Sequence, residues 1–66
     1  MRVFVNGEAR VLPDGATVET LLAALAIDRR RLAVERNLEI VPRAAHATTP
    51  LAEGDRVEIV TMVGGG

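Results

Sequence analysis

Three consecutive glycines, Gly64-Gly65-Gly66, follow directly on the most strand-like run of the sequence, residues 56–63. Glycine has no side chain to pack and loses the most conformational freedom on folding, so this segment is not expected to stabilise a fold. Chain ends are commonly dispensable, but a dispensable tail is seldom joined without a spacer to the best strand of a chain. The sequence therefore predicts that the terminal carboxylate of Gly66 is the reactive group and that the rest of the chain carries it.

A glycine carboxylate must be activated before it can react. A free α-carboxyl has a pKa of about 3.3–3.7, so it is ionised at neutral pH and is a poor electrophile. Attack on the α-phosphate of ATP is the normal route to an acyl-adenylate. Glycines suit a narrow nucleotide site because enzyme backbone can approach them closely, and Gly64 and Gly65 are predicted to thread the active sites of partner enzymes. The same glycines lack the spacing and the following helix of a phosphate-binding loop, so activation must come from a partner.

The remaining polar residues offer no competing catalytic or metal site. His46 is a lone histidine in a loop of small residues and is predicted to lie on the surface. We interpret Arg29-Arg30-Arg31 as a solvated turn, because no aromatic residues interleave with it for base stacking. Glu35 and Glu39 are not helically paired, and no Asp, Glu and His cluster has metal-ligand spacing. We expect no catalytic residue and no bound metal.

Composition limits the class of protein. Sixty-six residues with a net charge of −1 allow one domain and argue against nucleic-acid or anionic-membrane partners. Cysteine is absent, which excludes disulfides and sulfur held on cysteine side chains. No secretory signal or membrane-spanning apolar run is visible, so we expect a cytoplasmic protein. We also expect the protein to be monomeric when free.

Alternation and turn chemistry predict a β-hairpin in the first part of the chain. Residues 1–5 alternate and lead into Asn6-Gly7, the strongest short hairpin signal, and residues 8–12 form the returning strand. Thr17 is a good helix N-cap, and Asp28 is expected to cap a short turn after the helix. The apolar stripe of the helix consists of Val18, Leu21, Leu22 and Leu25, at i, i+3, i+4 and i+7.

The second half of the chain predicts three more strands. Residues 32–36 and Ile40-Val41 are short and β-like, residues 43–50 have no regular pattern, and Leu51 is expected in the core. Together with the long final strand, this order predicts an α+β fold of the β-grasp type, in which a mixed sheet of four to five strands packs on one main helix. A crossover through the helix lets the first and last strands lie parallel at the sheet centre. The domain is expected to span residues 1–63, and the glycine tail residues 64–66.

A sheet covered by one helix leaves its other face open to solvent or a partner. The residues expected to face the helix are Val3, Val5, Val57 and Ile59. This register places Phe4, Val60 and Met62 together on the open face, next to the tail. We therefore predict that Phe4, Val60 and Met62 form a docking surface for a partner protein.

Several segments resemble the ThiS family, the sulfur carriers of thiamin biosynthesis. They are Leu32-Ala-Val-Glu-Arg-Asn37, Ile40-Val-Pro-Arg43, Leu51-x-x-Gly54-Asp55-x-Val57-Glu-Ile-Val60 and Val63-Gly-Gly-Gly66, with Asn6-Gly7 and Thr17-Val-x-x-Leu-Leu22 in the front half. The resemblance covers essentially the whole chain and implies a ubiquitin-like β-grasp fold and a carrier role.

The resemblance also implies a series of partner reactions. A ThiF-like enzyme adenylates the terminal glycine with ATP and magnesium. Sulfur derived from cysteine through a desulfurase then converts the adenylate to a thiocarboxylate, and the thiazole synthase ThiG receives that sulfur. Carried onto this sequence, Gly66 is the adenylated and thiocarboxylated residue and Gly65 the glycine that threads the active sites.

Other functions stay open at this point. The chain could be a small molybdopterin synthase subunit or a tRNA-thiolating sulfur carrier, which share the same chemistry. It could instead be a β-grasp binding module of the TGS type, whose Pro-Asp-Gly-x-Thr-Val pattern resembles residues 13–18. A protein modifier joined to lysines is a further alternative.

Overall fold

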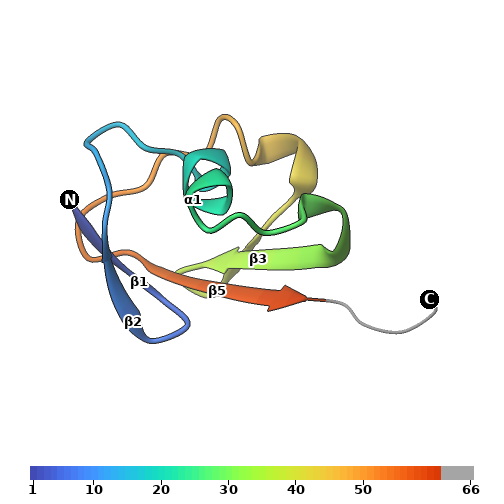
Figure 1. Ribbon diagram of the computed structural model, residues 1–66, viewed down its shortest axis with the longest axis horizontal. Helices are drawn as coiled ribbons and strands as arrows, with labels where there is room; N and C mark the ends of the chain where they lie inside the picture. The colour runs from blue at the N-terminus through green and yellow to red at the C-terminus, as the bar shows by residue number, and fades with distance from the viewer. Residues whose placement is uncertain (62–66) are drawn as a thin grey trace.

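A mixed sheet of five strands, covered on one face by helix α1, makes up the fold (Figure 1). The computed structural model describes residues 1–61, apart from the side chain of Arg29. The strands are β1 (Arg2–Val5), β2 (Glu8–Val11), β3 (Leu32–Arg36), β4 (Glu39–Val41) and β5 (Arg56–Thr61), and α1 spans Val18–Ala24. Two 3-10 helices, η1 (Arg29–Arg31) and η2 (Arg43–Ala45), complete the elements. The predicted ubiquitin-like β-grasp fold is confirmed.

Strand β5 occupies the centre of the sheet, whose order is β2-β1-β5-β3-β4. It runs parallel to β1, with Phe4 opposite Arg56, and antiparallel to β3, with Val34 opposite Ile59. This confirms the expected parallel pairing of the first and last strands. The described part of β5 ends at Thr61. The predicted domain limit at residue 63 lies outside the described residues and stays a prediction.

The helix begins where the sequence indicated. Thr17 has extended backbone, and its Oγ1 accepts a hydrogen bond from the Thr20 N–H at 3.2 Å, while Thr20 Oγ1 accepts from the Thr17 N–H at 3.2 Å. This capping box satisfies two otherwise unpaired amide groups. The helix ends after Ala24, and Ala26 adopts a left-handed conformation with φ 55°, as is common just past a helix end.

One hydrophobic core lies between α1 and the sheet. Its most completely buried side chains are Val3, Val18, Leu21, Leu22, Val34 and Val57. Leu51, which follows the loop after η2, is also buried, as predicted. Leu25 is only partly buried at the edge of this core. Among residues 1–61, no helix is long and apolar enough to cross a membrane.

The two hairpin turns differ at one position, which gives a stability prediction. Asn6-Gly7 joins β1 to β2 and Asn37-Leu38 joins β3 to β4, and all four residues have positive φ, as a type I′ turn requires. Leu38, at φ 71°, is 88% exposed, so it carries left-handed strain of about 1–2 kcal/mol without compensating packing. Leu38→Gly should raise the free energy of unfolding in urea by roughly 0.5–1 kcal/mol, after the greater freedom of glycine in the unfolded chain is subtracted.

A reciprocal variant provides the control. Gly7→Ala places a Cβ at φ 85°, where no heavy atom lies within 4 Å, so it adds backbone strain without a steric clash. It should lower the free energy of unfolding by about 1 kcal/mol. Destabilisation by Leu38→Gly would show that the exposed side chain contributes packing that outweighs the strain.

Candidate functional site

The candidate reactive segment continues from the central strand. Thr61, the last described residue of β5, is separated from the glycines only by Met62 and Val63. Gly64, Gly65 and Gly66 lie outside the described residues, so their predicted roles stay predictions. The structure describes the contacts at the two ends of β5, the strand that leads to these glycines.

A buried carboxylate holds the beginning of β5. Asp55 is 6% exposed and its Oδ2 accepts hydrogen bonds from Arg36 Nε at 2.7 Å and from the Ala52 N–H at 2.8 Å. Asn37 Nδ2 donates to Asp55 Oδ1 at 3.1 Å, and Asn37 Oδ1 accepts from the Arg56 N–H at 2.9 Å. The first residues of β5 are thereby tied to the end of β3.

The pKa of Asp55 reflects these contacts. Burial raises the pKa of its carboxyl, but the hydrogen bonds from Arg36, Asn37 and the Ala52 amide outweigh that effect, so the pKa is lowered overall. In the sequence, Glu53-Gly54-Asp55 indicates only a tight turn before the final strand. An aspartate directly before a strand, with Arg36-Asn37 at the end of another, was the available signal for this network.

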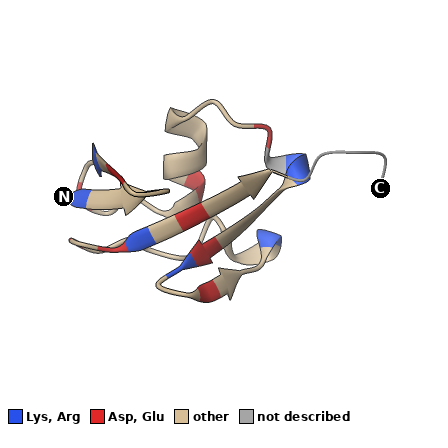
Figure 2. Ribbon diagram, turned by 90° about the horizontal axis from the view of Figure 1, so that it is seen from below, with Lys and Arg blue, Asp and Glu red and all other residues tan. Residues whose placement is uncertain are grey.

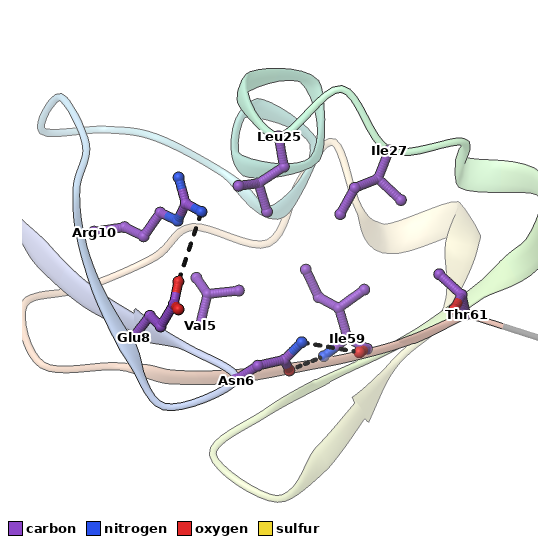
Figure 3. Close-up of a pocket in the computed structure, with 8 residues that line it drawn as sticks. All are labelled: Val5, Asn6, Glu8, Arg10, Leu25, Ile27, Ile59 and Thr61. Atoms are coloured by element: carbon purple, nitrogen blue, oxygen red, sulfur yellow. Dashed lines mark hydrogen bonds and ion pairs between the residues drawn. The ribbon is translucent and has the colours of Figure 1, made fainter.

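A groove of about 480 Å³ lies along the other end of β5 (Figure 3). Its lining residues are Val5, Asn6, Glu8, Arg10, Leu25, Ile27, Ile59 and Thr61. Leu25 and Ile27 extend into it from the end of α1 and the loop that follows, and Val5 and Ile59 form its apolar floor. On its rim Glu8 and Arg10 approach each other to 3.9 Å. This groove could not be predicted from the sequence, because its residues come from segments far apart in the chain.

The open face of the sheet carries the predicted docking residues. Phe4 is partly buried, with the Arg2 guanidinium carbon 5.6 Å from its ring centroid, and Val60 is 59% exposed. Both face away from α1, as predicted. Met62 lies outside the described residues.

The prediction that Val60 lies beside Phe4 on this face is wrong. Phe4 pairs with Arg56, so Glu58 lies between Phe4 and Val60 along that face of β5. Phe4 instead borders a shallow hollow of about 230 Å³ that Gly7, Arg56 and Glu58 also line. Alternation gave the face of each side chain correctly, but the parallel register of β1 on β5 sets their distance along it.

The two central strands β5 and β3 carry acidic and basic residues (Figure 2), so the open face is charged as well as apolar. Glu58 on β5 lies directly opposite Glu35 on β3, and Val60 lies opposite Ala33. Like charges directly opposite each other oppose strand pairing. The apolar surface at Val60 and Ala33 is thus bounded by an acidic pair on the side toward Phe4.

His46 is buried, so the prediction that it lies on the surface is wrong. It is 4% exposed and follows η2. Its Nε2 lies 3.2 Å from the Val41 carbonyl oxygen, and because a carbonyl can only accept, Nε2 is the protonated nitrogen. The His46 carbonyl accepts from the Glu19 N–H at 2.9 Å. These contacts join η2 to β4 and α1, which is a structural role; the small residues around His46 gave no periodic signal of η2.

The arginine run forms η1. Asp28 caps it, accepting from the Arg30 N–H at 3.0 Å and from Arg30 Nε at 3.1 Å. The hydrogen bonds from Arg30 lower the pKa of Asp28 to about 2. Arg30 and Arg31 are exposed, which confirms the solvated turn for these two residues. Within residues 1–61, no three acidic or histidine side chains are grouped so that they could hold a metal ion.

Comparison with known proteins gives consistent matches over the full chain. A family model described as "ThiS family" matches residues 2–66. A thiazole synthase of Paramagnetospirillum magneticum is 48% identical over 66 residues; the match covers 100% of this chain, which spans only 20% of that protein. The sulfur carrier protein ThiS of Thermus thermophilus is 34% identical, covering 97% of this chain and 98% of the relative.

The structural comparison agrees. The crystal structure of a thiamine biosynthesis protein (ThiS) from Geobacter metallireducens superposes with a TM-score of 0.85 at 33% sequence identity, covering 100% of both chains. The similarity therefore extends to the whole domain.

Proposed function

Because this chain belongs to the ThiS family, we propose that it is a sulfur carrier of thiamin biosynthesis whose reactive group is the carboxylate of Gly66. The observation that carries this proposal is the family match through residue 66, on a fold whose central strand leads to the glycines. The protein acts as a co-substrate of partner enzymes in the cytoplasm rather than as an enzyme.

The proposed chemistry has two steps at the carboxylate. In the site of a ThiF-like enzyme, a Gly66 carboxylate oxygen attacks the α-phosphorus of ATP and pyrophosphate leaves, with magnesium balancing the phosphate charge. The outer sulfur of a persulfide that a desulfurase derives from cysteine then attacks the acyl carbon and AMP leaves. A thiol cleaves the S–S bond of the resulting acyl disulfide, which releases the thiocarboxylate and leaves a disulfide on the donor. Gly64 and Gly65 thread the partner site, because residues without side chains let enzyme backbone approach closely.

A thiazole synthase is the proposed acceptor of the sulfur. Two proteins named thiazole synthase, from Paramagnetospirillum magneticum and Magnetococcus marinus, each match all of this chain over a fifth of their own length. In both proteins, a segment similar to this carrier is therefore part of a longer chain named thiazole synthase. This supports a ThiG-like enzyme as the partner.

Competition between acceptor enzymes tests the assignment. The thiocarboxylated protein is offered to a thiazole synthase with its other substrates, and to a molybdopterin synthase large subunit with its precursor. We expect sulfur transfer only in the thiazole reaction. Transfer only to the molybdopterin precursor would contradict the thiamin assignment and support the second carrier function.

The open face gives a further prediction about partner docking. A charge at Val60, which is 59% exposed, removes little packing but disrupts an apolar contact with an activating enzyme. Val60→Asp should raise the KM for the carrier in the ThiF-like reaction about tenfold or more, with a change in the free energy of unfolding below about 1 kcal/mol. Phe4→Asp should act in the same direction on binding, with a larger stability loss because Phe4 is partly buried.

Val11→Asp is the matched control. Val11 lies on β2, opposite Arg2, and is 81% exposed. It therefore presents an apolar side chain on the edge strand of the sheet, separated by β1 from β5 and Val60. Its KM should stay close to that of the wild-type protein. Equal effects at Val60 and Val11 would show that the docking surface is not centred on β5.

A further inference from the structure

The side chain of Asn6 contacts the backbone of β5 in addition to forming the hairpin turn. Its Nδ2 donates to the Ile59 carbonyl at 3.2 Å, and its Oδ1 accepts from the Ile59 N–H at 2.8 Å (Figure 3). One side-chain amide thus satisfies both backbone groups of a residue 53 positions later in the sequence.

This contact begins where the backbone pairing of β1 with β5 ends. The Phe4 N–H donates to the Asp55 carbonyl at 2.9 Å, and the Asn6 N–H donates to the Val57 carbonyl at 2.9 Å. The chain then turns through Asn6 and Gly7, so β1 supplies no backbone partner for Ile59. A side-chain amide carries the same donor and acceptor groups as a peptide unit. The Asn6 amide therefore continues the parallel ladder by one residue.

The position of this contact relates it to the reactive segment. On the other side of β5, Ala33 is opposite Val60 and Leu32 is opposite Thr61. Without the Asn6 amide, β5 would be paired on one side only from Ile59 onward. Backbone with fewer hydrogen bonds opens locally at lower free energy, and here that opening would occur immediately before the residues that lead to Gly66.

We infer that Asn6 is a positioning residue for sulfur transfer: its amide fixes the backbone of β5 at Ile59, and so the position from which the chain continues toward Gly66. This role presupposes the proposed function. A group that reacts in a partner's site must be placed accurately, since a misplacement of about 1 Å can cost about 100-fold in rate. A segment fixed at its base also loses less freedom on entering that site.

Asn6→Gly separates this role from that of the hairpin turn. Glycine adopts the positive φ that Asn6 has, 49°, so the type I′ turn is retained while both bonds to Ile59 are lost. Asn6→Asp is a second variant that also suits the turn. It keeps an acceptor for the Ile59 N–H but cannot donate to the Ile59 carbonyl.

Asn37→Gly is the matched control. Asn37 also has a positive φ, 51°, and its side chain also binds β5, accepting from the Arg56 N–H at 2.9 Å and donating to Asp55 at 3.1 Å. These contacts lie at the beginning of β5, away from Thr61. Asn37→Gly should therefore lower stability while the bonds between Asn6 and Ile59 are kept.

Two readouts on the full chain test the inference. Amide hydrogen exchange measured by NMR should show the Ile59 amide exchanging about tenfold faster in Asn6→Gly than in the wild-type protein, with Val34 unchanged. Thiocarboxylate formation with a ThiF-like enzyme, ATP and a sulfur source, followed by intact mass, should show kcat/KM reduced about tenfold, mainly through KM. The kcat/KM of Asn6→Asp should lie between those of the wild-type protein and Asn6→Gly. The kcat/KM of Asn37→Gly should stay within about twofold of the wild-type value.

Three outcomes would overturn the inference. They are unchanged Ile59 exchange, wild-type kcat/KM in Asn6→Gly, and losses of kcat/KM in the Asn6 and Asn37 variants that simply follow their losses of stability. If the wild-type protein itself is not activated, the proposed function is contradicted and the positioning role falls with it. That result is distinct from one in which the wild-type and variant proteins react equally.

Discussion

Removal of Gly65 and Gly66 is expected to abolish activation by a ThiF-like enzyme while leaving the fold intact. The buried side chains of the described core all precede residue 60, so the free energy of unfolding should change by less than about 0.5 kcal/mol. Two residues shorten the reach of an extended chain by about 7 Å. Because a displacement of about 1 Å can already cost about 100-fold, adenylate formation should fall below detection.

Adding one glycine after Gly66 is the control for chain length. It keeps all three native glycines but moves the terminal carboxylate about 3.5 Å further from the sheet, so it should also block activation. Activation of the shortened protein would show that the Gly66 carboxylate is not the reactive group. It would favour a β-grasp binding module, in which the glycines have no chemical role.

Asp55→Ala is expected to be the most destabilising single substitution of a polar residue among residues 1–61. It removes three hydrogen bonds and leaves the Ala52 N–H and the Arg36 guanidinium without their acceptor. Leaving buried donors unpaired costs about 1–3 kcal/mol each, and the partial exposure of Arg36, 33%, reduces that cost. We expect a loss of about 3 kcal/mol in urea unfolding, a large part of the stability of a domain this small.

Asp28→Ala is the matched control. Asp28 also binds an arginine, Arg30, at 3.1 Å, but its contacts are exposed to solvent. Exposed ion pairs contribute little to stability and loss of the η1 cap has a modest cost, so the loss of stability should be clearly smaller than in Asp55→Ala. A comparable loss in both variants would show that burial of the Asp55 network does not matter.

Because the pKa of Asp55 is lowered, its contribution to the free energy of unfolding depends on pH. Its folded pKa lies below that of the unfolded chain, which is about 3.9. The carboxylate therefore stabilises the fold fully above about pH 5 and loses this effect as pH falls through the folded pKa. The stability difference between the wild-type protein and Asp55→Asn should shrink below about pH 4. A difference that does not change with pH would place the contribution of Asp55 in packing instead of charge.

Local sequence signals predicted the elements of this fold well. Asn6-Gly7 gave the first hairpin because few other residue pairs adopt two successive positive φ angles. Thr17 marked the helix N-terminus because its hydroxyl competes for the free amide groups of the first turn. Alternation assigned Phe4 and Val60 to the open face. In each case the physical cause lies within a few residues of the signal.

Features that depend on distant segments were not predictable in the same way. The separation of Phe4 from Val60 follows from the register of β1 on β5, which no local pattern specifies. The hydrogen bonds between Asn6 and Ile59 join residues 53 positions apart. In the sequence, the hairpin turn alone is enough to account for an asparagine at position 6. His46 is buried because η2 brings it against Val41 and Glu19, which the small residues around it did not indicate.

Intact mass spectrometry tests the central claim most directly. The wild-type protein is incubated with a ThiF-like enzyme, ATP, magnesium and a cysteine-derived sulfur source, with the protein lacking Gly65 and Gly66 as its control. We predict that the wild-type mass increases by the difference between one sulfur and one oxygen atom, with fragmentation placing the change at Gly66. An unchanged wild-type mass, or the same increase in the shortened protein, would contradict the proposal that Gly66 carries the sulfur.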